Sequence, residues 1–136
     1  MDQARRTLNI MRIAFLIAIL LYVYISRTMS TSATPNWVIF YGIGALAVGE
    51  LGAMLVFWKI FILRSEGILQ AQPQDAKALA RWRTGYICLY CFALAIAIYG
   101  LILHFMGFGF AQVVPFFAVG AICILLLNPR RPALSR

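Results

Sequence analysis

The chain has 136 residues, of which 63% are hydrophobic and 12% are charged. Soluble domains are usually about 45–50% apolar and about 25% charged, so this composition is typical of a membrane protein and leaves too little polar chain for a soluble catalytic domain. The net charge of +8 would suggest nucleic-acid binding in a soluble protein. Here the basic residues lie at the ends of apolar runs, as a membrane surface selects, so no nucleic-acid partner is expected.

The first predicted membrane span covers about residues 8–29. A bilayer core about 30 Å thick needs about 20 mostly apolar residues in a helix, and the chain offers four such stretches. The first stretch follows Arg5, Arg6 and Arg12, which is also the charge pattern of a secretory signal peptide. We interpret it as a retained helix.

The second predicted span, about residues 36–63, is long, so its last turns from Trp58 onward are expected to enter the membrane interface or to tilt. A polar loop over about residues 64–83 follows. Within it Asp75 can cap a helix that runs into the next span, and a solvated linker is the alternative. The third and fourth spans are predicted at about 84–107 and 110–127.

The basic residues predict the orientation of these spans. If the chain crosses the bilayer four times, eleven of them fall on one side and Arg27 alone on the other. This is a strong positive-inside bias, so both termini and the 64–83 loop are expected in the cytoplasm. The eleven are Arg5, Arg6, Arg12, Lys59, Arg64, Lys77, Arg81, Arg83, Arg130, Arg131 and Arg136. We therefore predict an all-α integral membrane four-helix bundle, a single domain over residues 1–136, N-in/C-in, in a bacterial-type inner (plasma) membrane.

Glu50 is the residue that most strongly suggests a function, because it lies near the middle of the second span with no cation beside it in the sequence. A carboxylate inside the membrane is costly and is by default a functional-site hypothesis. Counted from the helix ends, Glu50 lies at the depth of Leu94, and Tyr90 is the best hydrogen-bonding partner within the chain. The alternatives are a role in packing alone, in handling an ion or proton, or in contacting another subunit.

The same helix carries a strip of small residues that fall within about 100° of one another on a 3.6-residue wheel. Such a strip lets a neighbouring helix approach closely. Glu50 lies at its border. The members of this small-residue strip are Gly42, Ala45, Gly49, Gly52 and Ala53.

His104, the single histidine, lies toward the outer end of the third span and can supply one axial ligand to a haem or pigment. A structural role at the interface is the alternative. No zinc spacing, nucleotide-binding loop or Ser-His-Asp set is present, so no enzymatic activity and no metal site are expected.

Residues 37–106 resemble the helical hairpin of ATP synthase c-type (proteolipid) subunits. The resemblance rests on a Gly-rich helix, a polar loop and a small-residue second helix over residues 93–102. In that family the ion-binding carboxylate lies six residues before a glycine of the second helix, and here Gly100 places Leu94 at that position. The resemblance implies a hairpin with its loop in the cytoplasm, and Glu50 on the other helix is a hypothetical replacement for the missing group.

These observations lead to three functional hypotheses. The first is an accessory or structural subunit of a larger membrane complex, or a self-assembling bundle, which contacts its partners through the small-residue strip. The second is an oligomeric proton or cation carrier that uses Glu50. The third is a haem or pigment protein that uses His104.

Overall fold

The computed structural model describes residues 2–30 and 32–129, and this part of the chain is helical with short connections. The elements in chain order are α1 (Asp2–Thr28), α2 (Trp37–Phe57), the π-helix η1 (Trp58–Leu63), α3 (Arg64–Ala71), α4 (Ala76–Phe105) and α5 (Phe110–Leu126). The prediction of an all-helical chain is confirmed in these residues. Arg130, Arg131 and Arg136, which contribute to the positive-inside bias, lie outside them.

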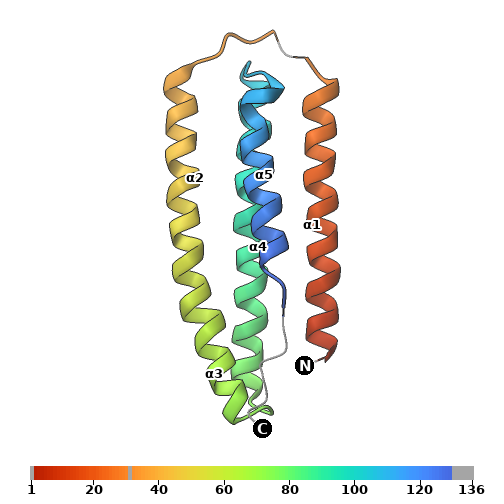
Figure 1. Cartoon of the computed structure of the whole chain (residues 1–136), viewed down its shortest axis with the longest axis vertical. Helices are drawn as coiled ribbons and strands as arrows, with labels where there is room; N and C mark the ends of the chain where they lie inside the picture. Colours follow the sequence, from red (N-terminus) through yellow and green to blue (C-terminus); the bar gives the residue numbers. More distant parts are fainter. Residues whose placement is uncertain (1, 31, 130–136) are drawn as a thin grey trace.

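Three helical stretches are long and apolar enough to cross a membrane, namely Asp2–Thr28, Trp37–Ala71 and Ala76–Phe105. The fourth, α5, is apolar but has only 17 residues. The helices run lengthwise in one bundle (Figure 1). We call the end that carries α3 the α3 end, and the opposite end, where residues 29–36 and 107–109 connect the helices, the His104 end.

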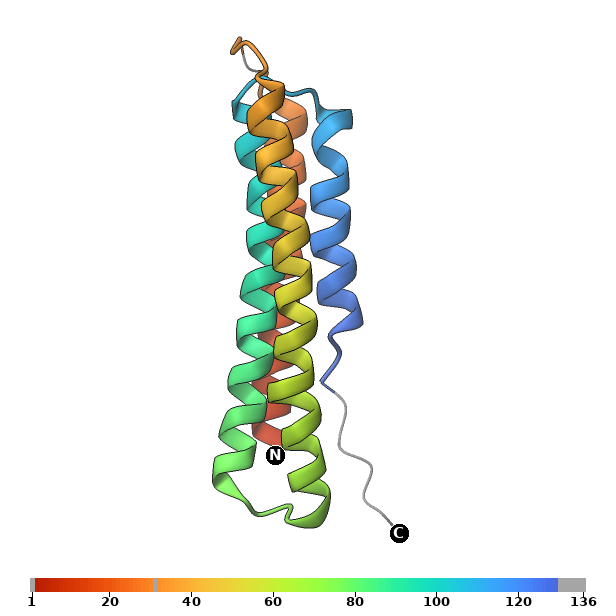
Figure 2. The ribbon, with the colours of Figure 1, turned by 90° about the vertical axis from the view of Figure 1, so that its left-hand side faces the viewer.

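The bundle has a central pair, α4 and α5, with α1 and α2 on opposite sides of it (Figures 1 and 2). The α4–α5 contact is close because Gly120 leaves room for the α4 backbone: a Cβ at this position would lie 2.8 Å from the carbonyl oxygen of Ala93. Among the described residues α1 packs against α4 and α5 but does not contact α2. The connection between α1 and α2 therefore crosses over the α4–α5 turn (Figure 1).

The polar region predicted as a loop over residues 64–83 is mostly helical, which corrects that assignment. α3 occupies residues 64–71, and α4 already begins at Ala76, so only residues 72–75 connect the two helices. The predicted cap is confirmed, because the Asp75 carboxylate accepts hydrogen bonds from the backbone N–H groups of Lys77 and Ala78 at 2.9 and 3.2 Å. Leu69 of α3 is buried, and its burial stabilises this short helix.

The transition from α2 to α3 runs through η1 without a break in the helix. Its wider turn accompanies a close approach to α4, since a Cβ on Gly85 would lie 2.9 Å from Ile62 Cδ1 and from Phe61 Cβ. Beyond it, Trp82 is fully buried, and its indole Nε1–H donates to Glu66 at 3.3 Å. The α3 end is therefore a packed extension of the bundle.

Candidate functional site

Glu50 is a half-buried residue of α2 whose side chain meets α4. Its carboxyl interacts with the hydroxyl of Tyr99, which comes from α4. The predicted partner, Tyr90, was wrong: its hydroxyl instead donates to the carbonyl oxygen of Leu127 at 2.7 Å. The Oε2 atom of Glu50 is buried and has no hydrogen-bond partner within the described residues. Leu94 of α4 is half-buried.

The small-residue strip faces away from the rest of the chain. All five of its residues are exposed, whereas Ala47 and Met54 on the opposite side of α2 are buried against the bundle. A Cβ added at Gly42, Gly49 or Gly52 would meet nothing within 4 Å. Within residues 2–30 and 32–129, no helix makes the close approach that the strip allows.

His104 is buried, with 6% of its surface exposed, and ties together the two connections at its end of the bundle. Its Nε2 lies 2.6 Å from the carbonyl oxygen of Met29, which directly follows α1, and its Nδ1 lies 3.1 Å from that of Phe108. Both ring nitrogens therefore face backbone carbonyl oxygens. An axial ligand needs a free ring nitrogen, so this arrangement favours the structural role over the haem or pigment site.

Sequence reasoning missed a hydrogen-bonded cap on the C-terminus of α5. The Arg12 guanidinium of α1 reaches across and donates to the carbonyl oxygens of Ile124 at 3.2 Å and Leu125 at 2.8 Å. It also donates to Oδ1 of Asn128 at 3.3 Å. A helix C-terminus has unpaired carbonyl groups and a partial negative charge, both of which a guanidinium satisfies.

Two tyrosines of α4 complete this cap. Tyr90 donates to the carbonyl oxygen of Leu127, and the Tyr86 hydroxyl lies 3.4 Å from that of Asn128. The hydroxyl groups thus satisfy carbonyl groups that follow the last turn of α5. In the sequence, the only sign of this cap is an arginine inside an apolar run, which is equally typical of an interfacial anchor.

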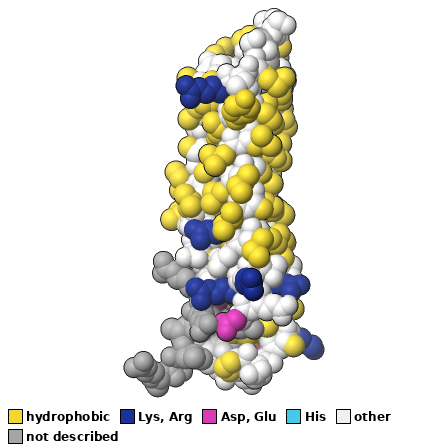
Figure 3. Space-filling view, turned by 90° about the vertical axis from the view of Figure 1, so that its right-hand side faces the viewer, with side chains coloured by type: hydrophobic (Ala, Val, Ile, Leu, Met, Phe, Trp, Pro, Cys, Tyr) yellow, Lys and Arg dark blue, Asp and Glu magenta, His cyan; other side chains and the backbone are white. Residues whose placement is uncertain are grey.

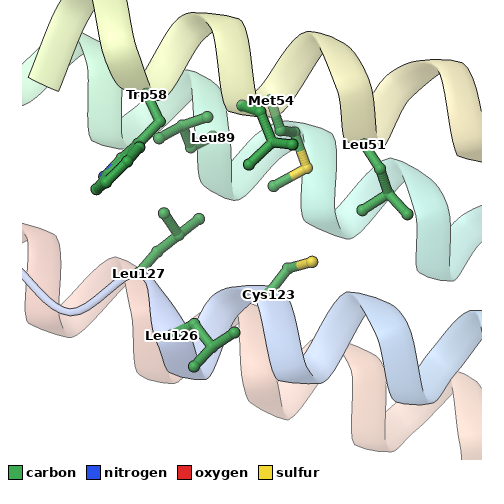
Figure 4. A pocket seen from close by; sticks show the side chains of 8 residues that line it. Leu51, Met54, Trp58, Leu89, Cys123, Leu126 and Leu127 are labelled. Atoms are coloured by element: carbon green, nitrogen blue, oxygen red, sulfur yellow. The ribbon is translucent and has the colours of Figure 1, made fainter.

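An apolar groove of about 500 Å³ opens between α2 and α5 in the half of the bundle nearer the α3 end. Figure 4 shows side chains of α2 on one side of it and those of α5 on the other. Apart from the Trp58 indole and the Cys123 thiol, its lining offers no hydrogen-bonding side chain. The lining residues are Leu51, Met54, Leu55, Trp58, Leu89, Cys123, Leu126 and Leu127.

Within the described ranges, no group of three or more His, Cys, Asp or Glu side chains is arranged to hold a metal ion. Comparison with known proteins gives no match to a family model, to a curated protein or to a solved structure. The candidate functional features of the chain are the Glu50–Tyr99 pair and the outward-facing small-residue strip of α2.

Proposed function

We propose that this chain is a small integral membrane protein that acts as an accessory or structural subunit, binding a helix of another subunit or of a second copy through the small-residue strip of α2. The observation that carries the proposal is the position of that strip: three glycines and two alanines are exposed on one long apolar helix, and no helix in the described part of the chain covers them.

The membrane placement is supported by the length of the apolar helices and by the distribution of charge. On the face seen in Figure 3, hydrophobic side chains form a broad belt, with basic side chains gathered toward the α3 end and a basic group at the opposite end. We place the α3 end in the cytoplasm of a bacterial-type cell because the positive-inside rule favours the side with more arginine and lysine. Both termini then face the cytoplasm.

Lateral association through this strip has a physical basis in the membrane. Lipid chains are as apolar as leucine, so burial alone does not bring helices together, and close backbone packing at small residues becomes the main attraction. Gly49 and Gly52 lie about one turn apart in α2, and a Cβ added at either would meet nothing within 4 Å. Glu50, at the border of the strip, adds a polar group that a partner helix can meet.

The test is a paired bulky substitution, Gly49→Leu with Gly52→Leu, in the full chain. We expect association in mild detergent, measured by cross-linking, sedimentation and co-purifying proteins, to fall to background while the isolated subunit stays folded. Ala14→Leu is the matched control, because Ala14 is an exposed small residue on α1. A double variant that still associates as the wild type does, or a wild type that is a lone monomer without partners, contradicts the proposal.

A second candidate, an oligomeric proton or cation carrier, is favoured by the unpartnered Oε2 of Glu50 and by the Tyr99 hydroxyl beside the carboxyl. A carrier needs a membrane-embedded group that binds and releases its ion. Proteoliposome flux should fall at least tenfold in Glu50→Gln and stay unchanged in Glu66→Gln, the same chemical change at the α3 end. Flux equal to wild type in Glu50→Gln removes this candidate.

A further inference from the structure

A second cavity, of about 440 Å³, lies beside the C-terminus of α5, where the short helix ends next to α1. Its lining combines polar and apolar groups: Asn9, Arg12 and Asn128 form a polar part, and Ile13 and Leu16 form an apolar part. None of the described residues that line it carries a carboxylate. On α1 the nearest acidic residue is Asp2, ten residues from Arg12 and about 15 Å away along the helix axis.

Arg12 retains both charge and hydrogen-bonding capacity after it caps α5. A guanidinium has five N–H donors, and its three nitrogens each make one hydrogen bond to the end of α5. The helix terminus contributes a partial charge of about −0.5, so about half of the positive charge of Arg12 is uncompensated. Such a group favours an anion with oxygen acceptors.

Arg5 extends the same stripe of α1. Residues 5, 9, 12 and 16 follow the spacing that places side chains on one face of a helix. The Nε atom of Arg5 is buried and has no hydrogen-bond partner within the described residues. A second cation therefore lies about 10 Å along the axis from Arg12, on the side of the cavity toward the α3 end.

The cavity lining changes from polar to apolar in the same direction as a membrane lipid does from its headgroup to its acyl chains. From the α3 end toward the middle of the bundle, α1 presents Asn9, Arg12, Ile13 and Leu16 in turn, followed by the exposed apolar residues Ile17 and Leu20. A free phosphate ester would use only the polar part. A phospholipid would use both.

We propose that this cavity binds the phosphate group of an anionic phospholipid, with Arg12 and Asn9 as hydrogen-bond donors and with Ile13 and Leu16 against the first carbons of an acyl chain. The inference rests on the membrane placement proposed above, but not on association through α2. The bound lipid fills the notch left by the short α5 and neutralises the remaining charge of Arg12.

The experiment measures lipid binding to the detergent-solubilised full chain by native mass spectrometry, with phosphatidylglycerol and phosphatidylcholine of identical acyl chains. We expect wild type to prefer phosphatidylglycerol by about fivefold, as for one cation that meets one anionic headgroup. Arg12→Gln should abolish the preference. Because this change also removes the α5 cap, the deciding variant is Asn9→Glu, which leaves the cap in place and puts a carboxylate into the cavity.

Thr7→Glu is the matched control, since it adds the same charge to an exposed position on another face of α1. Loss of the preference in Asn9→Glu together with its retention in Thr7→Glu supports the site. A preference that survives in Asn9→Glu, or no preference in wild type, overturns it. Full displacement of the lipid by an equal concentration of glycerol 1-phosphate also overturns it, because the apolar part of the cavity then contributes nothing. Each outcome is independent of whether the chain associates through α2.

Discussion

Replacement of Gly120 by alanine tests whether the α4–α5 pair is the tightly packed centre of the fold. The added methyl group would lie 2.8 Å from the carbonyl oxygen of Ala93 and 3.2 Å from Cβ of Ala97. The shorter distance is about 0.6 Å below ordinary van der Waals contact, and the atom it meets is backbone, which cannot rotate away. The two helices would have to separate along part of their length.

The magnitude follows from comparison with Gly49→Ala on α2, where nothing lies within 4 Å of the added methyl. Both changes alter the helix propensity in the same way, so their difference isolates the packing cost. Overpacking of a close contact typically costs about 1–3 kcal/mol, and we expect Gly120→Ala to be less stable than Gly49→Ala by that amount. Gly49→Ala itself should be neutral or slightly stabilising in the monomer.

The assay is the reversible unfolding of the purified monomer as a denaturing detergent replaces a mild one, followed by circular dichroism and tryptophan fluorescence. The free energies of unfolding of the two variants are compared at matched lipid and detergent. If the free energy of unfolding of Gly120→Ala lies less than about 0.5 kcal/mol below that of Gly49→Ala, the close α4–α5 contact is refuted.

Three further substitutions probe the two ends of the bundle. His104→Phe should cost about 1–3 kcal/mol, because it removes the hydrogen bonding of the buried imidazole to the backbone at Met29 and Phe108. Amide exchange of residues 107–109 should quicken, and unchanged exchange would contradict this role of His104. Tyr90→Phe should cost about 0.5–1.5 kcal/mol and loosen the end of α5, while Tyr99→Phe leaves that end as protected as in wild type. Gly107→Ala should lower the thermal midpoint more than Gly67→Ala, because Gly107 has φ of +102° and faces the backbone of the α1–α2 connection.

The helices themselves were predictable, because an apolar run of membrane length has few other structures available to it. The Asp75 cap was also predictable, since it depends on residues adjacent in sequence. α3 was not: its eight residues carry Gly67 and no strongly apolar pattern, so it is stabilised by its partners and not by intrinsic preference. The π-helical turn at Trp58 has no sequence signature of this kind.

The partner of Glu50 illustrates why depth alone does not place a side chain. Counting from helix ends compares positions along the bundle axis but says nothing about rotation of a helix about its own axis. Tyr99 follows Tyr90 by nine residues, which turns it by about 180° to the opposite side of α4. Tyr90 therefore faces the end of α5, and Tyr99 faces α2.

The small-residue strip of α2 shows a further limit of sequence periodicity. The spacing of these residues predicted that they share one face of the helix, and all five are exposed together. Periodicity does not say whether a neighbouring helix on that face belongs to the same chain. The Arg12 cap was missed for a related reason, since it joins residues 112 positions apart. Which helices pack together over that separation depends on the whole bundle and not on the local sequence.

The 17 residues of α5 have a mechanical consequence for the surrounding membrane. At 1.5 Å per residue the helix is about 26 Å long, shorter than a hydrocarbon core of about 30 Å, whereas the helices beside it exceed that thickness. In the placement proposed here, the bilayer next to α5 must become thinner and the bilayer next to α2 need not. The bilayer would then be deformed on one side of the protein only. This deformation favours thinner membrane regions, and it favours neighbouring proteins that place their own short helix beside α5.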